Sequence, residues 1–198
     1  MRLFVGVALS LELKEKIFPI LDELGKLGAG LSIVPAENLH FTLKFLGDVD
    51  EQRIPDIIAR LDVIARNCSS FSAQLHGLGA FSSEGSVRVV WVGVKENISF
   101  VFLLRNVQSA LEIVRAEEYH DPIVHLTLAR VQNQHNKEKL HELIETYRDS
   151  SFGRFTIDRF VLYKSVLGRN GPVYSEVASF YLKNEEMNDF LRLDRTKI

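Results

Sequence analysis

The stretches His40-Phe41-Thr42-Leu43 and His125-Leu126-Thr127-Leu128 repeat one pattern, His-x-Thr-Leu, in two distant parts of the chain. Each stretch is typical of a β-strand, on which side chains two positions apart point to the same face. Each copy would therefore present an imidazole beside a hydroxyl. Two such pairs brought together supply two acid–base groups and two hydrogen-bond donors, which suits phosphoryl chemistry without a metal.

The spacing of the two motifs recurs outside them. His40 and His125 are separated by about 85 residues, a period long enough to hold a unit of several strands and helices. The opening strands, predicted from Leu3 and from Val87, share nearly the same offset, and so do the closing strands near Phe71 and Thr156. We interpret this offset as an internal duplication of a strand–helix–strand–helix–strand unit. Two copies are too few for a solenoid and favour two lobes related by a pseudo-twofold axis.

The sequence therefore predicts an α+β fold in a single two-lobed domain, with repeats at about 1–84 and 85–182 and a C-terminal tail at 183–198. A cleft between the lobes would bring the two histidines face to face. Strands are predicted at 3–9, 39–45, 71–81, 87–94, 124–129, 155–166 and 173–182. Helices are predicted from an N-cap at Ser10 to about residue 26, at 98–114, at 137–148, and to about residue 66 from a start after 48 that the position of Pro55 leaves open. Pro19 predicts a kink or a break in the first helix, and a short helix is expected in the tail.

Composition and charge are those of an ordinary globular protein: 46% of residues are hydrophobic, 25% are charged, and the net charge is −2. This balance argues against a nucleic-acid binder that relies on basic tails, so the basic surface of any nucleic-acid contact would have to be local. The single cysteine, Cys68, excludes an internal disulfide and a multi-cysteine metal site. We expect no signal peptide, no membrane span, and a cytoplasmic location.

Histidine is the side chain whose ordinary pKa makes both protonation states available near neutral pH. One neutral imidazole could accept a proton from water, while the other, charged, donates a proton to a leaving oxygen. The hydroxyls of Thr42 and Thr127 could donate to the phosphate oxygens. A strained cyclic phosphodiester needs the least activation. The symmetry of His40 and His125 leaves open which one is the acid, and we expect neither a metal nor another cofactor.

The chain resembles the two-histidine phosphoesterase superfamily and, within it, the RNA 2′,3′-cyclic phosphodiesterases, also described as 2′-5′ RNA ligase-like proteins. The matching stretches cover the chain nearly end to end in the family's order: 2–5, 40–47, 91–93, 125–130, 165–167 and 171–174. One departure is that many relatives carry Pro-His at the second motif, whereas here Pro122 precedes His125 by three residues.

The resemblance implies that two antiparallel sheets flank the cleft. It also implies metal-free hydrolysis of a 2′,3′-cyclic phosphate at an RNA end to a 2′-phosphate, with tRNA fragments as one candidate substrate and reverse 2′-5′ ligation as an additional activity. It further implies that His40 donates a proton to the leaving oxygen, that His125 activates water, and that Thr42 and Thr127 hold the phosphate. We expect a monomer with no obligate protein partner.

Three further residues are candidate substrate contacts. Lys44, four positions after His40, shares its face if the strand stays regular. Arg130, five positions after His125, would reach the cleft only through a bulge or the end of the strand. Tyr174 follows a Gly-Pro pair and could stack on a base.

Three alternative functions stay open. The first is a cyclic phosphodiesterase acting on small nucleotides such as ADP-ribose cyclic phosphate, and the second is a non-catalytic module that binds RNA ends. The third is a metal hydrolase with His40 and His125 as ligands. Neither motif contains an acidic ligand, and their spacing matches no zinc pattern, which disfavours the third.

Overall fold

The computed structural model describes residues 1–28, 30–95, 98–112, 114, 123–133, 135–168 and 171–184. Short 3₁₀ helices lie at Ala36–Asn38 and Glu51–Arg53. The helices and strands are, in chain order, β1 (Arg2–Ala8), α1 (Leu11–Lys26), β2 (Leu31–Ile33), β3 (His40–Asp48), α2 (Ile54–Asn67), β4 (Phe71–Ser83), β5 (Ser86–Lys95), α3 (Ile98–Ala110), β6 (His125–Val131), α4 (Lys137–Thr146), β7 (Ser151–Ile157), β8 (Arg159–Gly168) and β9 (Gly171–Tyr181).

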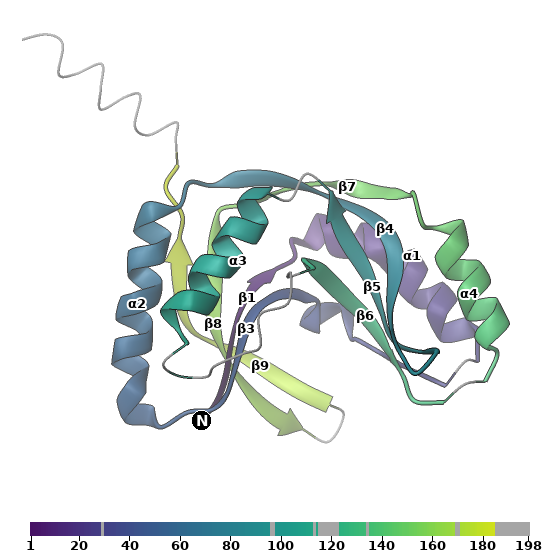
Figure 1. Ribbon diagram of the computed structural model, residues 1–198, viewed down its shortest axis with the longest axis horizontal. Coiled ribbons are helices and arrows are strands. Elements are labelled where there is room, and N and C mark those ends of the chain that lie inside the picture. The colour runs from purple at the N-terminus through teal and green to yellow at the C-terminus, as the bar shows by residue number, and fades with distance from the viewer. Residues whose placement is uncertain are drawn as a thin grey trace, which may run out of the picture.

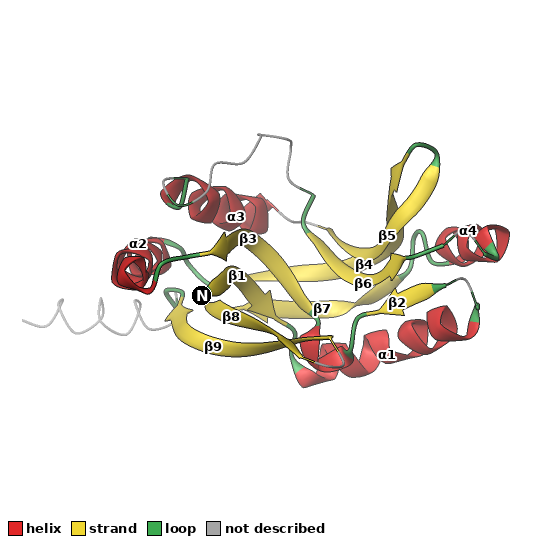
Figure 2. Ribbon diagram, turned by 90° about the horizontal axis from the view of Figure 1, so that it is seen from below, coloured by secondary structure: helices red, strands yellow, loops and turns green. Residues whose placement is uncertain are grey.

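The described strands form one sheet in the order β7-β4-β5-β6-β3-β1-β8-β9, with β2 added on β6. Each pairing between these strands is antiparallel. The two central strands, β3 and β6, meet at a single pair, Phe41 opposite Leu126. This joint divides the curled sheet into half A (β3-β1-β8-β9) and half B (β7-β4-β5-β6 with β2), which are visible in Figures 1 and 2. The two expected sheets are thus two halves of one sheet.

The two halves do not follow the expected repeat boundary near residue 84. Strand β4 lies in the first expected repeat but pairs with β5 in half B, whereas β8, from the second expected repeat, pairs with β1 in half A and carries β9 at its other edge. The reason is local. Glu84 and Gly85 have positive φ angles of 53° and 74° between the paired residues Ser83 and Ser86, as a two-residue hairpin turn requires. That turn ties β4 to its neighbour in sequence.

The helices cover the convex side of the sheet, as Figure 1 shows. Helices α2 and α3 pack on half A through β9 and β3, and α1 and α4 pack on half B through β7 and β4. Their buried residues follow helical spacing, as in α1, where Leu13, Ile17, Ile20, Leu21 and Leu24 face the core. Burial of these faces leaves the concave side of the sheet for the motif side chains.

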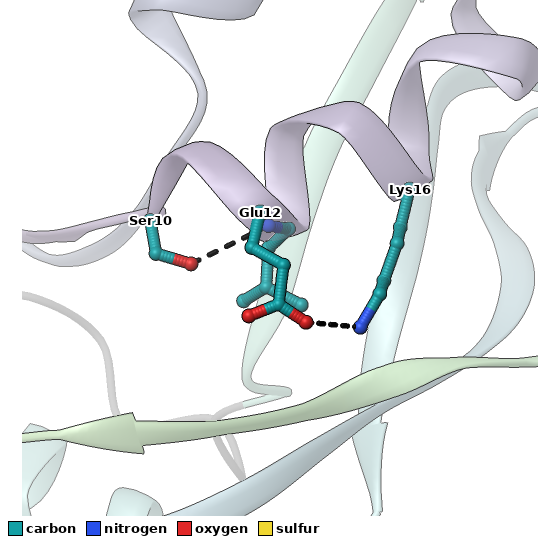
Figure 3. A network of polar contacts seen from close by, with 4 residues as sticks. Ser10, Glu12 and Lys16 are labelled. Carbon is teal, nitrogen blue, oxygen red and sulfur yellow. Dashed lines mark hydrogen bonds and ion pairs between the residues drawn. The ribbon is translucent and has the colours of Figure 1, made fainter.

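Helix α1 begins at a polar cap. The Ser10 hydroxyl accepts a hydrogen bond from the Leu13 amide at 3.4 Å, and Lys16 pairs with Glu12 at 2.5 Å one turn later (Figure 3). Of the kink or break expected at Pro19, the break is not observed, because the helix continues from Leu11 to Lys26. The turns on both sides of the proline are packed into the core, which offsets the loss of one backbone hydrogen bond.

Two other expectations on secondary structure need correction. The single strand expected at 155–166 is two strands, β7 and β8, separated at Asp158, and the three-residue β2 was not expected at all. The helix expected in the tail lies outside the described residues. None of the described helices combines the length and apolar character that crossing a bilayer requires.

Candidate functional site

The two motifs meet at the joint between the halves. Phe41 and Leu126 face each other there, and both side chains are buried on the side that the helices cover. Phe41 packs against Phe100 of α3 with a ring-centroid distance of 5.1 Å. Because side chains alternate along a strand, the histidine and threonine of each motif point to the opposite, concave face. The fold therefore gathers both expected His–Thr pairs in one place.

Both histidines are anchored in the same way. Nδ1 of His40 lies 2.7 Å from the Asn38 carbonyl oxygen, and Nδ1 of His125 lies 2.7 Å from the Ile123 carbonyl oxygen. A carbonyl can only accept, so Nδ1 carries the hydrogen in each ring. Nε2 is then the atom left to exchange a proton in the cleft. Asn38 and Ile123 each precede their histidine by two positions, so the two carbonyl groups occupy equivalent places before the two motifs.

The surroundings lower the pKa of both histidines. For His40, burial is the largest cause; the hydrogen bond to the Asn38 carbonyl opposes it, and the charge of His125 lowers the pKa further. For His125, burial again dominates, the Ile123 carbonyl opposes it, and the charge of Arg130 adds to the lowering of the pKa. Because a charge on one ring disfavours a charge on the other, the state in which one ring is protonated and the other is neutral is favoured over the state in which both are charged. An acid–base pair requires this state.

A β-bulge after Thr42 changes which later side chains enter the cleft. Gly6 of β1 pairs with Thr42, and Val5, the residue before it, pairs with Lys44. Leu43 is therefore an extra residue on β3, and the alternation of side chains shifts by one beyond it.

The expectation that Lys44 shares the face of His40 is wrong for this reason. Lys44 is only 2% exposed, and its Nζ donates to the Gln108 carbonyl oxygen at 3.3 Å, near the end of α3. The bulge has turned Lys44 to the side that the helices cover. It is therefore removed from the candidate substrate contacts.

The same bulge occurs after Thr127 and has the reverse consequence. Trp91 pairs with Thr127 and Val90 with Ala129, so Leu128 is the extra residue on β6. The shift turns Arg130 toward the face of the motif. The charge of Arg130 lowers the pKa of His125 and, with the charge of Arg2, opposes the rise that burial causes in the pKa of Tyr174, so the positive charge of Arg130 acts on both rings.

Tyr174 belongs to an aromatic cluster beside His40. Its ring centroid lies 5.3 Å from that of His40 and 4.9 Å from that of Phe4, edge-on in both cases. Phe4 lies 4.7 Å from His40 and stacks on Tyr163 at 5.0 Å. A cavity of about 600 Å³ opens here, between β1, segment 35–39 and the β8–β9 hairpin. Among the described residues, its lining includes all four rings but not His125.

Half B has a different aromatic cluster beside His125. The Phe81 ring lies 4.8 Å from His125, edge-on, and the Trp91 indole lies 6.3 Å from it. The indole lies over Gly79, where an added Cβ would come within 2.3 Å of it. Sequence reasoning missed the roles of Phe4, Phe81 and Trp91. The sequence carries two signals for them. Phe4 and Gly6 are two positions apart and therefore share one face of β1, and Trp91 follows Gly6 by the same offset that separates the two histidines.

No group of three or more His, Cys, Asp or Glu side chains placed to hold a metal ion occurs in the described part of the chain. The two histidines and the two threonines are the polar side chains that the motifs contribute to this face. Their chemistry is that of proton transfer and of hydrogen bonding to an anion.

Known phosphoesterases share this sequence pattern. A family model described as LigT-like phosphoesterase matches residues 7–91 and 103–174, which include both motifs. The RNA 2′,3′-cyclic phosphodiesterase of Archaeoglobus fulgidus is 36% identical over 91% of this chain and 99% of its own length. The protein of the same name from Methanocaldococcus jannaschii is 33% identical over 89% of this chain and 98% of its own.

Solved structures share the fold. TT0787 of Thermus thermophilus superposes with a TM-score of 0.77 at 29% identity, covering 93% of this chain and 100% of that one. Escherichia coli LigT in its apo form superposes with a TM-score of 0.72 at 24% identity, covering 92% and 97%. The family match extends over well more than half of the chain and includes both motifs. The chain therefore belongs to the LigT-like phosphoesterase family.

Proposed function

We propose that this protein hydrolyses the 2′,3′-cyclic phosphodiester at RNA 3′ ends and leaves a 2′-phosphate. The observation that carries this proposal is the pairing of Phe41 with Leu126, which brings two His–Thr pairs to one face of the sheet. Membership of the family and the relatives named RNA 2′,3′-cyclic phosphodiesterase support it. The protein would act in the cytoplasm, as a monomer.

The reaction needs two proton transfers. Nε2 of neutral His125 takes a proton from water as the oxygen attacks phosphorus, and the bond from phosphorus to the ribose 3′-oxygen breaks. Nε2 of protonated His40 gives its proton to that oxygen, so the products are a 3′-hydroxyl and a 2′-phosphate. The same steps with an RNA 5′-hydroxyl in place of water form a 2′-5′ linkage, which is the proposed ligation.

The remaining side chains stabilise the phosphate. The hydroxyls of Thr42 and Thr127 lie beside the histidines and donate to the non-bridging oxygens, where negative charge increases in the transition state. Arg130 adds a positive charge that acts on both His125 and Tyr174. Tyr174 contacts the nucleoside part of the substrate. A cyclic phosphate within a small nucleotide satisfies the same groups, and the cavity beside His40 has the size of a small-molecule site.

The direct test is end conversion. RNA and a small nucleotide, each with a 2′,3′-cyclic phosphate, are incubated with wild type, His40→Ala, His125→Ala and His141→Ala. His141 is an exposed histidine on α4 and serves as the matched control. We expect wild type and His141→Ala to convert the RNA end and each motif variant to lose at least about 100-fold in rate.

Three outcomes contradict the proposal. If wild type binds RNA ends without converting them, the protein is a binding module. If the small nucleotide is hydrolysed faster than the RNA end, the substrate is a small nucleotide and not RNA. Activity that is lost with EDTA and restored by zinc would support the metal hydrolase.

A further inference from the structure

The residues that anchor the two motif histidines have equivalent carbonyl groups but different side chains. The amide nitrogen of Asn38 donates a hydrogen bond to the Pro172 carbonyl oxygen at 2.9 Å, which joins the segment before β3 to the β8–β9 hairpin. Ile123, at the equivalent place before His125, has an apolar side chain that is 54% exposed. The anchor of His40 is therefore tied to a distant part of the fold, whereas the side chain that carries the anchor of His125 has no group for such a bond.

The backbone around Asn38 gives this side-chain bond its importance. The 3₁₀ helix Ala36–Asn38 is a single turn without a side-chain cap, and such short turns are weakly held by their own hydrogen bonds. Leu39 is 1% exposed and fixes where the segment lies. The peptide group that joins Asn38 to Leu39 carries the carbonyl that holds His40, and its N–H donates to the Ala36 carbonyl oxygen at a long 3.4 Å. The bond from the Asn38 side chain is thus a second tie on the direction of this carbonyl.

The direction of the carbonyl decides which way the His40 ring faces. The ring packs against Phe4 at 4.7 Å and Tyr174 at 5.3 Å between centroids. Packing alone does not distinguish two ring orientations related by a half turn, because the nitrogen and C–H groups of imidazole are nearly equal in size. The hydrogen bond from Nδ1 to the Asn38 carbonyl does distinguish them. A half turn would move Nε2 away from the place where it exchanges a proton.

The hairpin that receives the bond is itself loosely packed near its end. Val166, Leu167 and Val173 are 50%, 86% and 61% exposed, and this end of the hairpin extends beyond the rest of half A in Figure 1. Pro172 lies opposite Leu167 near the turn, and Tyr174 follows it by two positions. A shift of the hairpin would therefore move the oxygen atom to which the Asn38 side chain is bound.

We propose that Asn38 is a positioning residue that couples the β8–β9 hairpin to His40. Its side chain ties the carbonyl that orients the imidazole to the Pro172 carbonyl, so the place of the hairpin sets the direction of Nε2 in half A. This inference rests on the proposed function and deepens it. The two histidines share one motif and one kind of anchor, but the fold adjusts only the first of them through the hairpin.

The ring nitrogens of His40 provide a test that needs no turnover. Wild type, Asn38→Leu and Asn38→Ala are labelled with ¹⁵N in histidine, and long-range proton–nitrogen spectra are recorded at about pH 8, where both imidazoles are neutral. The signals of His40 are those absent from His40→Ala. We expect the hydrogen to lie on Nδ1 of both motif histidines in wild type. In both Asn38 variants the two nitrogen shifts of His40 should move toward each other, because the ring then samples both tautomers, while those of His125 stay unchanged.

The kinetic test separates positioning from substrate binding. With an RNA cyclic end as substrate, both Asn38 variants should lower kcat at least about tenfold and leave KM within about twofold, because a misdirected ring is bound beside the substrate but does not react. Asn67→Leu is the matched control. Its amide also donates to a backbone carbonyl, that of Val63 at 2.8 Å, but on the exposed side of α2, and both constants should stay within about twofold of wild type.

A change in the hairpin tests the coupling directly. Gly171 has a φ of 116°, which other residues rarely adopt, and nothing lies within 4 Å of an added Cβ there. Gly171→Ala therefore displaces the backbone next to Pro172 without adding a contact. We expect it to lower kcat at least about threefold in wild type and less than about 1.5-fold in Asn38→Leu. Gly85→Ala is the matched control in the β4–β5 hairpin, since Gly85 has a φ of 74° and the same open space.

The outcomes separate the two proposals. Unchanged His40 nitrogen shifts in both Asn38 variants, equal changes in both histidines, or a rise in KM with kcat unchanged would overturn the positioning role while hydrolysis stands. The same factor for Gly171→Ala in both backgrounds would overturn the coupling to the hairpin. If wild type converts no cyclic end, the proposed function fails, whereas the nitrogen shifts still decide whether Asn38 orients His40.

Discussion

Phe41 lies directly opposite Leu126 at the joint between β3 and β6, each being the residue between the histidine and the threonine of its motif. The pseudo-twofold axis that we expect from the sequence would pass through this pair and exchange the two motifs. The buried side chains of the pair fix the register, because a slip by one residue would turn both histidines into the core. This single contact therefore explains how two short motifs that are distant in sequence form one site.

The pH dependence follows from the lowered pKa values of the two histidines. Because burial lowers both below the ordinary value of 6.5, the kcat/KM profile of wild type should be a bell with its maximum below pH 6.5. The bound phosphate is negative and favours the imidazolium, so the kcat profile should lie at higher pH. A kcat/KM maximum above about pH 7, or a profile flat from about pH 5 to 9, would contradict this.

Acid unfolding must be separated from this loss of activity. The folded state holds the two histidines at lowered pKa values, so the unfolded chain binds protons first as the pH falls. Stability should therefore decrease below about pH 6.5 and be fully regained above it. Thermal melting across the same pH range shows where the enzyme is still folded, and only those points enter the kinetic profile.

The roles of the two histidines can be separated by the leaving group. A cyclic substrate with sulfur in place of the bridging 3′-oxygen releases a thiolate that needs no proton. We expect this substrate to restore most of the rate lost in His40→Ala and none of that lost in His125→Ala. Equal rescue in both variants, measured by single-turnover kinetics, would contradict the assignment of His40 as the acid.

The two bulges predict opposite results for two basic residues. Lys44→Met should leave KM within about twofold and change the free energy of unfolding by about 1–3 kcal/mol, because the lysine is buried against α3. Arg130→Met should raise KM at least about fivefold and leave stability within about 0.5 kcal/mol, because the arginine is exposed. Urea titration and steady-state kinetics check both. If KM rises in Lys44→Met but not in Arg130→Met, then Lys44 faces the cleft and β3 has no bulge.

The packing of Trp91 predicts a position-specific effect of a methyl group. Gly79→Ala should destabilise the protein by about 1–3 kcal/mol and shift tryptophan emission, because the added Cβ meets the indole. Gly25→Ala is the matched control: nothing lies within 4 Å of its added Cβ, and in the last turn of α1 it should stabilise by up to about 1 kcal/mol. Unchanged emission in Gly79→Ala would show that the indole lies elsewhere.

The sequence predicted the motif face because alternation along a strand is a local property. His40 and Thr42, and their counterparts, needed only the two-residue period and the offset between the repeats. Lys44 was misplaced because a bulge depends on pairing with β1, which the chain does not reveal locally. The same holds for the exchange of β4 and β8 between the halves. The cavity was not predicted because Phe4, Tyr163 and Tyr174 come together only through that exchange.

The most direct test of the central claim is hydrolysis of a cyclic RNA end in H₂¹⁸O, with the product identified by mass spectrometry and the position of its phosphate by chromatography of the terminal nucleotide against authentic 2′- and 3′-phosphates. The account predicts a single product, a 2′-phosphate that carries one ¹⁸O, formed by wild type and abolished in both His40→Ala and His125→Ala. Full activity in both variants, or a wild type that leaves the cyclic end unchanged, would contradict it.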